Sequence, residues 1–65
     1  MGAPKFTIGQ TVMIEAPKLY GAPHGRFTIV RAMPGDRGQV QYRIKSGLET
    51  YERVVEERLL RAEEL

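Results

Sequence analysis

The side chains of this chain that are suited to binding chemistry are cationic and aromatic, and most lie in or near the stretch QVQYRIKSGLETYERVV, residues 39–55. Alternate residues of a β-strand point to the same face of a sheet, so cations at every second position predict a basic face. Guanidinium and ammonium groups bind phosphates, and tyrosine rings stack on nucleobases. The candidate binding residues are therefore Arg31, Arg43, Lys45, Arg53, Tyr51 and Tyr20.

The residues needed for catalysis are sparse. His24 is the only histidine, and it lies in a loop rich in glycine and proline. A histidine base needs an orienting carboxylate and a nucleophile beside it, and the sequence offers only Ser46, in a predicted turn. Asp36, in the segment PGDRG, is typical of a turn residue. We therefore expect no catalytic residues and no enzyme activity.

Metal and cofactor sites are not expected either. The chain has no cysteine, which excludes disulfides, thiolate-bound zinc, iron–sulfur clusters and thiol catalysis. The adjacent pairs Glu56–Glu57 and Glu63–Glu64 point apart along the chain, which is poor geometry for a hard cation. The segments GAPHG and GDRG lack the spacing of a phosphate-cradling loop. The cysteine-free composition fits a cytoplasmic protein.

Length and charge limit the class of protein. The 65 residues make one domain, residues 1–65, with an ordered core over about 5–62. No apolar run approaches the ~20 residues that span a bilayer, so no membrane partner is expected. The net charge of +2 divides into +5 over residues 1–46 and −3 over residues 47–65. This asymmetry indicates either an anionic partner or two complementary halves of one small domain.

The periodicity predicts short strands rather than helices. Four segments combine alternating apolar residues with β-branched or aromatic ones, and glycine or proline bounds most of them: residues 9–17, 26–34, 39–45 and 50–55. Between them lie a loop at 17–25 and turns at 35–38 and 46–49. The adjacent apolar residues Ile29 and Val30 predict a bulge or a bend.

The segment after Val55 has two interpretations. Good helix formers and a Glu57/Arg61 pair would suit a helix over 56–65. The alternative is a single helical turn at 56–59, with Leu59 in the core, followed by a closing strand at 60–62. We favour the second interpretation, because the preceding strands need closing.

Together these elements predict an all-β fold, a small antiparallel barrel of about five short strands with one helical turn near the C-terminus. The connections are too short for crossover helices, and closure of a barrel removes exposed edges. The alternation predicts a core of Val12, Ile14, Phe27, Ile29, Val40, Tyr42, Ile44, Val54 and Leu59, with Phe6 and Met33 as lids.

The order of these features resembles a known group of folds. An F-x-x-G-x-x-V opening at Phe6, Gly9 and Val12, followed by four strands, a helical turn and a short last strand, resembles SH3-like small barrels. The KOW and Tudor-type branches are nearest. The run YRIK…E…ERVVEERL resembles short alphaproteobacterial proteins of unknown function with this barrel. The resemblance covers about residues 5–62 and implies the fold, which hosts readers of peptides, nucleic acids and methylated residues.

Two binding functions follow from these observations. The first is binding of RNA or DNA through a basic sheet face. The second is protein–protein interaction, as a module or a small assembly subunit that docks through loops 17–25 and 46–49, where Leu19, Tyr20 and Leu48 are apolar. In that case we expect a monomer or a weak homodimer. A methyl-lysine cage is not expected, because only Tyr20 and Tyr51 of the aromatic residues look exposed, and a proline-peptide groove is not expected, because the chain has no tryptophan.

The basic face depends on the register of the hairpin at 39–55, because a slip of one residue moves every side chain to the other face. A register with Val54 opposite Tyr42 or Val40 buries Val54 and places Arg43, Lys45, Tyr51 and Arg53 outside. A register with Arg43 opposite Glu52 neutralises that cation and turns Tyr51, Val55 and Arg53 inward. We favour the first, because burying a charged Arg53 is costly.

Overall fold

The structure, a computed structural model, describes residues 4–63 except the side chains of Tyr20 and Asp36. It contains five strands and three short 3-10 turns: β1 (Thr11–Ile14), η1 (Pro17–Tyr20), β2 (Phe27–Pro34), η2 (Asp36–Gly38), β3 (Val40–Lys45), β4 (Glu52–Glu56), η3 (Glu57–Leu59) and β5 (Leu60–Ala62). All strand pairs are antiparallel, in one sheet of order β4-β3-β2-β1-β5. The expected small all-β fold of five short strands is confirmed.

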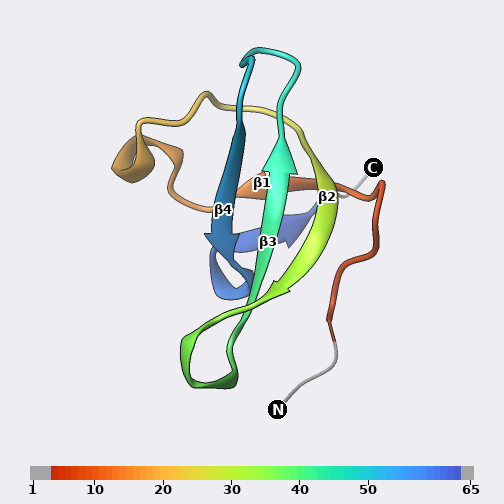
Figure 1. The fold of residues 1–65 in the computed structure, drawn as a ribbon. Coiled ribbons are helices and arrows are strands. Elements are labelled where there is room, and N and C mark those ends of the chain that lie inside the picture. Colours follow the sequence, from red (N-terminus) through yellow and green to blue (C-terminus); the bar gives the residue numbers. More distant parts are fainter. Residues whose placement is uncertain (1–3, 64–65) are drawn as a thin grey trace.

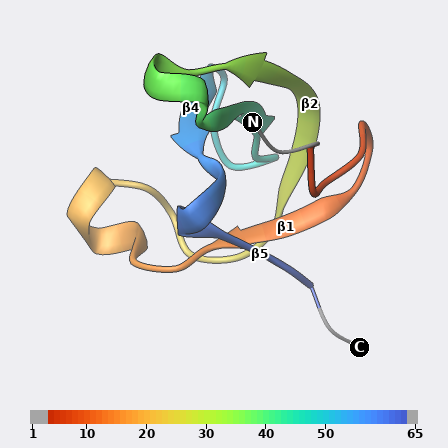
Figure 2. The same cartoon turned by 90° about the horizontal axis from the view of Figure 1, so that it is seen from below.

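The sheet is strongly bent. Figure 1 shows β4, β3 and β2 side by side, with β1 and β5 crossing behind them, and Figure 2 shows the chain curling around its interior. The pairing of β2 with β3 shifts between Ile29 and Arg31, so Val30 is the extra residue of a bulge, as the adjacent apolar pair predicted. A bulge increases the local bend and twist of a strand, which helps β2 to pair with both β3 and β1.

The end of the chain adds the last strand to the sheet. After β4, the turn η3 leads into β5, which pairs with β1 through Val12, Met13 and Ile14. The Glu15 N–H donates to the Leu59 carbonyl oxygen at 2.8 Å and extends this pairing. The predicted helical turn and the short strand at 60–62 are therefore confirmed, and the alternative helix through this segment is wrong. Strand pairing satisfies backbone groups that a short terminal helix would have left to water.

Nine apolar side chains form the buried core: Phe6, Val12, Ile14, Phe27, Ile29, Tyr42, Ile44, Val55 and Leu60. Phe6, expected only as a lid, is fully part of it and packs edge-to-face on Tyr42 with ring centroids 5.4 Å apart. Val40 and Leu59, expected in the core, are half-buried and pack against it. Met33 is half-buried and lines a surface pocket beside Pro4.

The hairpin register differs from the favoured one. Tyr42 lies opposite Val55 and Arg43 lies opposite Val54, so Val55 is 6% exposed while Val54 is 45% exposed. Burial of Val54 is therefore a wrong prediction. The alternative register, with Arg43 opposite Glu52, also differs from the observed one, in which Arg43 lies opposite Val54, two residues further along β4. It placed Val55 and Arg53 on the correct side of the sheet, because a shift of two residues keeps each side chain on the same face. The reason is that the inward-facing Arg53 forms an ion pair with Glu49. This pair offsets the desolvation cost that was expected to keep the guanidinium on the outer face.

Candidate functional site

The outer face of strands β2, β3 and β4 carries three of the predicted binding residues. Arg31 on β2 lies directly opposite Arg43 on β3, and Lys45 lies two residues from Arg43 on the same strand and therefore on the same face. Their neighbours on this face follow from the register. From one end of the sheet to the other, the cross-strand rows are Thr28–Lys45–Glu52, Arg31–Arg43–Val54 and Met33–Gln41–Glu56. We call the three cations Arg31, Arg43 and Lys45 the basic cluster.

The basic cluster is only partly neutralised. Arg43 Nη1 lies 3.4 Å from Glu52 Oε1, with about a third of each side chain exposed, and a pair this exposed contributes at most about 1 kcal/mol. Among the side chains that the structure describes, which do not include that of Asp36, no carboxylate lies within ion-pair distance of Arg31 or Lys45. Like charges directly opposite each other across two strands are destabilising. An anion bound between Arg31 and Arg43 would remove that repulsion.

Arg53, predicted on the outer face, lies on the inner side of β4. Its Nε donates to Glu49 Oε1 at 2.8 Å, and its Nη2 donates to the Gly21 carbonyl oxygen at 3.2 Å. The Arg53 and Glu49 side chains are 18% and 9% exposed. The hydrogen bond from Arg53 lowers the pKa of Glu49, and the same bond raises the pKa of Arg53. Arg53 therefore links the β3–β4 loop to the loop after η1, and it is absent from the basic cluster.

Tyr51 immediately precedes β4 in the chain and lies beside Arg53. The ring is 57% exposed, and the guanidinium carbon of Arg53 lies 5.3 Å from the ring centroid. Arg53 Nη2 also donates to the Tyr51 hydroxyl at 3.3 Å. Because Glu52 lies opposite Lys45 on the outer face, the preceding Tyr51 shares the side of Arg53 and is absent from the basic cluster. The side chain of Tyr20 lies outside the described part of the structure.

A hydrogen-bonded cluster that the sequence did not reveal is built around Tyr42. The buried hydroxyl accepts hydrogen bonds from the backbone N–H groups of Lys5 and Phe6 at 2.8 and 3.0 Å. It donates to Glu57 Oε2 at 2.6 Å, and this oxygen also accepts the Lys5 N–H at 2.9 Å. The only available signal was that a tyrosine in a predicted core needs a partner for its hydroxyl. This cluster ties the N-terminal segment to β3 and η3.

The Tyr42 cluster shifts the pKa of both of its titratable groups. Burial, followed by the hydrogen bond to Glu57, raises the pKa of Tyr42. The hydrogen bonds from Tyr42 and from the Lys5 backbone lower the pKa of Glu57. The neutral tyrosine and the ionised carboxylate are therefore the forms that the fold stabilises, which indicates a structural role for the pair.

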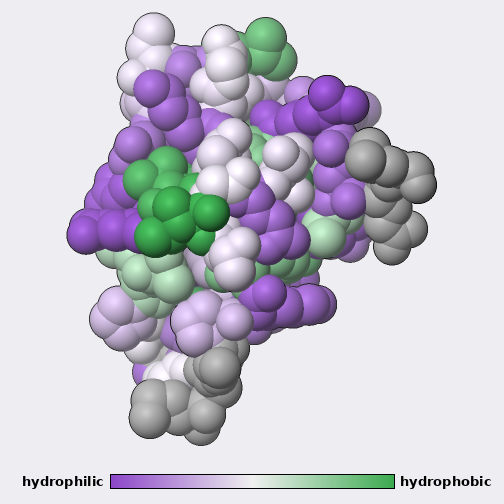
Figure 3. Space-filling model, turned by 90° about the vertical axis from the view of Figure 1, so that its right-hand side faces the viewer, coloured by the Kyte–Doolittle hydropathy of each residue, from purple (hydrophilic) through white to green (hydrophobic). Residues whose placement is uncertain are grey.

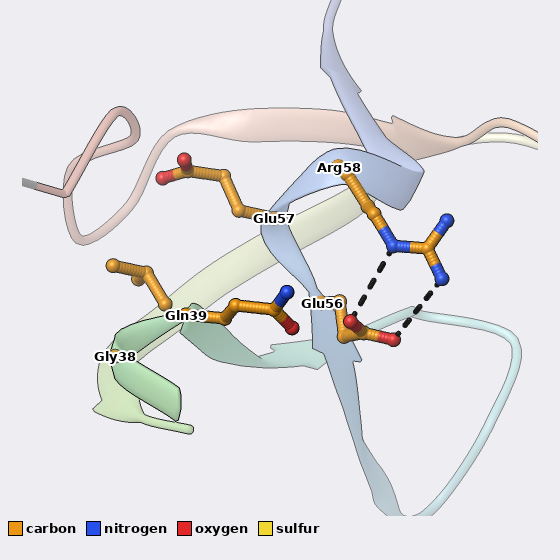
Figure 4. Close-up of a pocket in the computed structure, with 6 residues that line it drawn as sticks. Gly38, Gln39, Glu56, Glu57 and Arg58 are labelled. Atoms are coloured by element: carbon orange, nitrogen blue, oxygen red, sulfur yellow. Dashed lines mark hydrogen bonds and ion pairs between the residues drawn. The ribbon is translucent and has the colours of Figure 1, made fainter. Parts of the chain in front are cut away.

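A surface pocket of about 220 Å³ lies next to this cluster and is lined by Gly38, Gln39, Val40, Glu56, Glu57 and Arg58 (Figure 4). Arg58 spans its rim to Glu56, with Nε–Oε2 and Nη2–Oε1 distances of 3.4 and 3.5 Å. Figure 4 shows the Glu57 side chain pointing away from that pair. The charged groups of the pocket are thus paired with each other or with Tyr42, so we place the candidate site on the outer face instead.

The residues considered for catalysis have structural surroundings. Ser46 is buried, and its Oγ accepts the Leu48 N–H at 3.1 Å, which stabilises the predicted turn. His24 is exposed. In the part of the chain that the structure describes, no group of three or more histidine or acidic side chains is placed to hold a metal ion. Within the same residues, no helix is long and apolar enough to cross a membrane.

Comparisons with protein-family models, with curated proteins and with solved structures find no match to this chain. The resemblance to SH3-like barrels of the KOW and Tudor branches, and to alphaproteobacterial proteins, therefore stays a prediction.

Proposed function

We propose that this protein is a non-catalytic binding module that holds the phosphate backbone of a nucleic acid, RNA or DNA, on the outer face of its sheet. The observation that carries the proposal is the cross-strand pair Arg31–Arg43 with Lys45 beside it. Neighbouring strands lie about 5 Å apart, and residues two apart on a strand are separated by about 7 Å. Three cations within this area suit a flexible polyanion, because each can take a separate phosphate.

The number of cations sets the expected strength and salt dependence. Three phosphate contacts to a single strand give a slope of log K against log salt of about −2. A rise from about 50 to about 200 mM salt should therefore weaken binding about 20-fold. The affinity itself should be modest, with Kd values on the order of 10⁻⁴ to 10⁻⁶ M, as for other contacts made mainly with phosphates.

The test is a fluorescence-anisotropy titration of labelled single-stranded oligonucleotides at several salt concentrations. We expect Arg31→Gln to weaken binding about fivefold, equivalent to about 1 kcal/mol, and to reduce the magnitude of the salt slope by about 0.7. Arg61→Gln is the matched control, because it removes the same charge from β5, which β1 separates from β2. Absence of binding at low salt, or equal losses in the two variants, would refute the proposal.

A second candidate function is protein interaction through loops 17–25 and 46–49. It is favoured by the exposure of Leu19 and Leu48, at 81% and 76%. On the side of the molecule in Figure 3, which faces away from η1, the apolar residues form separate patches among polar ones. Sedimentation across a concentration series tests it: Leu48→Ser should remove any self-association, and a strict monomer would exclude the homodimer.

Two further expectations belong to this proposal. The cytoplasmic location rests on the cysteine-free composition, and fractionation of cells that express the tagged chain tests it. Membership of the SH3-like barrels is supported by the five antiparallel strands and the turn η3 before β5.

A further inference from the structure

We propose that a pocket beside Lys45 receives one unpaired base of a single-stranded nucleic acid whose phosphates lie on the basic cluster. This inference rests on the proposed function and adds a selectivity to it: the bound molecule presents bases without a pairing partner. The pocket has a volume of about 320 Å³ and is lined by Thr28, Val30, Lys45, Ser46 and Gly47. Lys45 belongs to the basic cluster and also lines the pocket, so a phosphate held by Lys45 brings its nucleoside to the pocket.

The pairing of β2 with β3 brings the lining residues together. Thr28 lies directly opposite Lys45, and both side chains are exposed on the outer face. Val30 is the extra residue of the bulge and is half-buried. A bulge changes the direction of side chains relative to a regular strand. Ser46 and Gly47 follow Lys45 directly in the chain. The regular outer face is thus interrupted by a pocket next to a cation.

The polar groups of the pocket are mainly hydrogen-bond donors. The Lys45 ammonium can only donate, whereas the Thr28 hydroxyl can donate or accept. Ser46 is 3% exposed, and its Oγ accepts the Leu48 N–H at 3.1 Å. Among the hydrogen bonds of the described residues, none is donated by the Ser46 hydroxyl, so its hydrogen is available to a ligand. Thymine and uracil each present carbonyl oxygens to such donors, whereas adenine presents an amino group. We therefore expect thymine or uracil to be preferred over adenine.

The size and the apolar part of the pocket suit a single base. Val30 and the methylene stem of Lys45 can contact the apolar face of a base. The volume is at the low end of the range of about 300–1,000 Å³ for small-molecule sites. In a duplex, a base would have to leave the stack and its partner to enter, which costs a few kcal/mol. A single strand offers its bases without that cost. The inference therefore predicts a preference for unpaired RNA or DNA over duplex.

The test is the anisotropy titration with oligothymidine, oligodeoxyadenosine and an abasic oligonucleotide of equal length, each of about a dozen nucleotides. The variant Gly47→Leu narrows the pocket. A β-carbon at Gly47 meets no atom within 4 Å, and Gly47 is not among the glycines with positive φ, so the fold accepts the side chain. We expect Gly47→Leu to weaken oligothymidine binding about fivefold, near the lower end of the effect of one base contact. Binding of the abasic strand should not change, because it has phosphates and no bases.

A second variant and a control accompany Gly47→Leu. Thr28→Leu narrows the pocket from β2, at an exposed position, and should weaken oligothymidine binding in the same way. Thr50→Leu is the matched control, because it adds the same side chain to an exposed position of the β3–β4 connection that does not line the pocket. We expect this control to leave the binding of all three strands unchanged.

The outcomes separate this inference from the proposed function. If Arg31→Gln weakens binding of the abasic strand while Gly47→Leu and Thr28→Leu leave oligothymidine binding unchanged, the phosphate site stands and the pocket inference is wrong. Equal weakening of the abasic strand and oligothymidine by the two pocket variants would also refute it, because the loss would then not involve a base. Equal affinity of the unaltered protein for oligothymidine and oligodeoxyadenosine would refute the expected base preference. If the unaltered protein binds none of the three strands, the proposed function fails and the inference fails with it.

Discussion

Replacement of Tyr42 by phenylalanine should be among the most destabilising one-atom changes in this protein. The hydroxyl accepts the N–H groups of Lys5 and Phe6 and donates to Glu57. In Tyr42→Phe the Lys5 N–H keeps its bond to Glu57 Oε2, at 2.9 Å. The Phe6 N–H has no such second acceptor among the hydrogen bonds of the described residues, and its bond to Tyr42 is buried. The variant therefore leaves one buried donor unsatisfied and removes one bond to a carboxylate.

The size of the effect follows from these two losses. An unsatisfied buried donor costs about 1–3 kcal/mol, and a hydrogen bond to a charged group contributes about 1.5–3 kcal/mol. Glu57 is partly solvated, so the lower values apply, and we expect a loss of about 2.5 kcal/mol in the free energy of unfolding. A domain of this length loses about 4–8 °C in Tm per kcal/mol, so Tm should fall by about 10–20 °C. This is a large share of the stability of a 65-residue domain.

The assay is urea and thermal unfolding followed by circular dichroism, with Tyr51→Phe as the matched control. That variant also removes one tyrosine hydroxyl, but the Tyr51 side chain is 57% exposed, and its hydroxyl, which accepts the 3.3 Å bond from Arg53 and also interacts with Glu49, lies at the surface. We expect the control to change stability by less than about 0.5 kcal/mol. A loss below about 1 kcal/mol in Tyr42→Phe, or an equal loss in the control, would show that the cluster does not tie down the N-terminal segment.

Two further predictions test the register and the carboxylates. In urea unfolding, Val55→Ala should lower the free energy of unfolding by about 2 kcal/mol, and Val54→Ala by less than about 0.5 kcal/mol, because Val55 is buried and Val54 is exposed. A larger loss in Val54→Ala than in Val55→Ala would contradict the register. Because the pKa values of Glu57 and Glu49 are lowered in the folded state, their contribution is complete above the usual carboxyl pKa of 4.5 and is lost as the pH falls through the lowered values. Tm should therefore fall below about pH 4.5 in the unaltered protein and less steeply in Glu57→Gln, and parallel Tm–pH curves would exclude a contribution from Glu57.

The strands and most of the core could be predicted because their signal is local. Val12 and Ile14 alternate with polar or half-buried residues, as do Tyr42 and Ile44, and all four are buried. The period of two is a property of an extended chain and does not depend on which strands pair. The bulge beside Ile29 was also visible locally, since two adjacent apolar residues cannot both face the core of a regular strand.

The register of β3 and β4 could not be predicted, because it depends on the ion pair between Arg53 and Glu49, and the alternation of apolar and polar residues gives no sign of that pair. Glu49 lies in the loop four residues before Arg53, and its carboxylate makes the inward position of Arg53 stable. Without that partner, burial of a guanidinium argues against the observed register. The Tyr42 cluster was missed for the same reason, since its partners Lys5 and Glu57 are 37 and 15 residues away in the chain.

The sequence by itself determined the class of fold, the approximate positions of the strands, and the presence of more cations than carboxylates over residues 1–46. Only the tertiary structure decided which of those cations share a face. Arg31 and Arg43 come together because β2 and β3 pair with a bulge between Ile29 and Arg31, whereas Arg53 is turned to the opposite side by a register different from the one expected. The physical reason is that side-chain direction along a strand alternates, so a displacement of one residue exchanges the two faces.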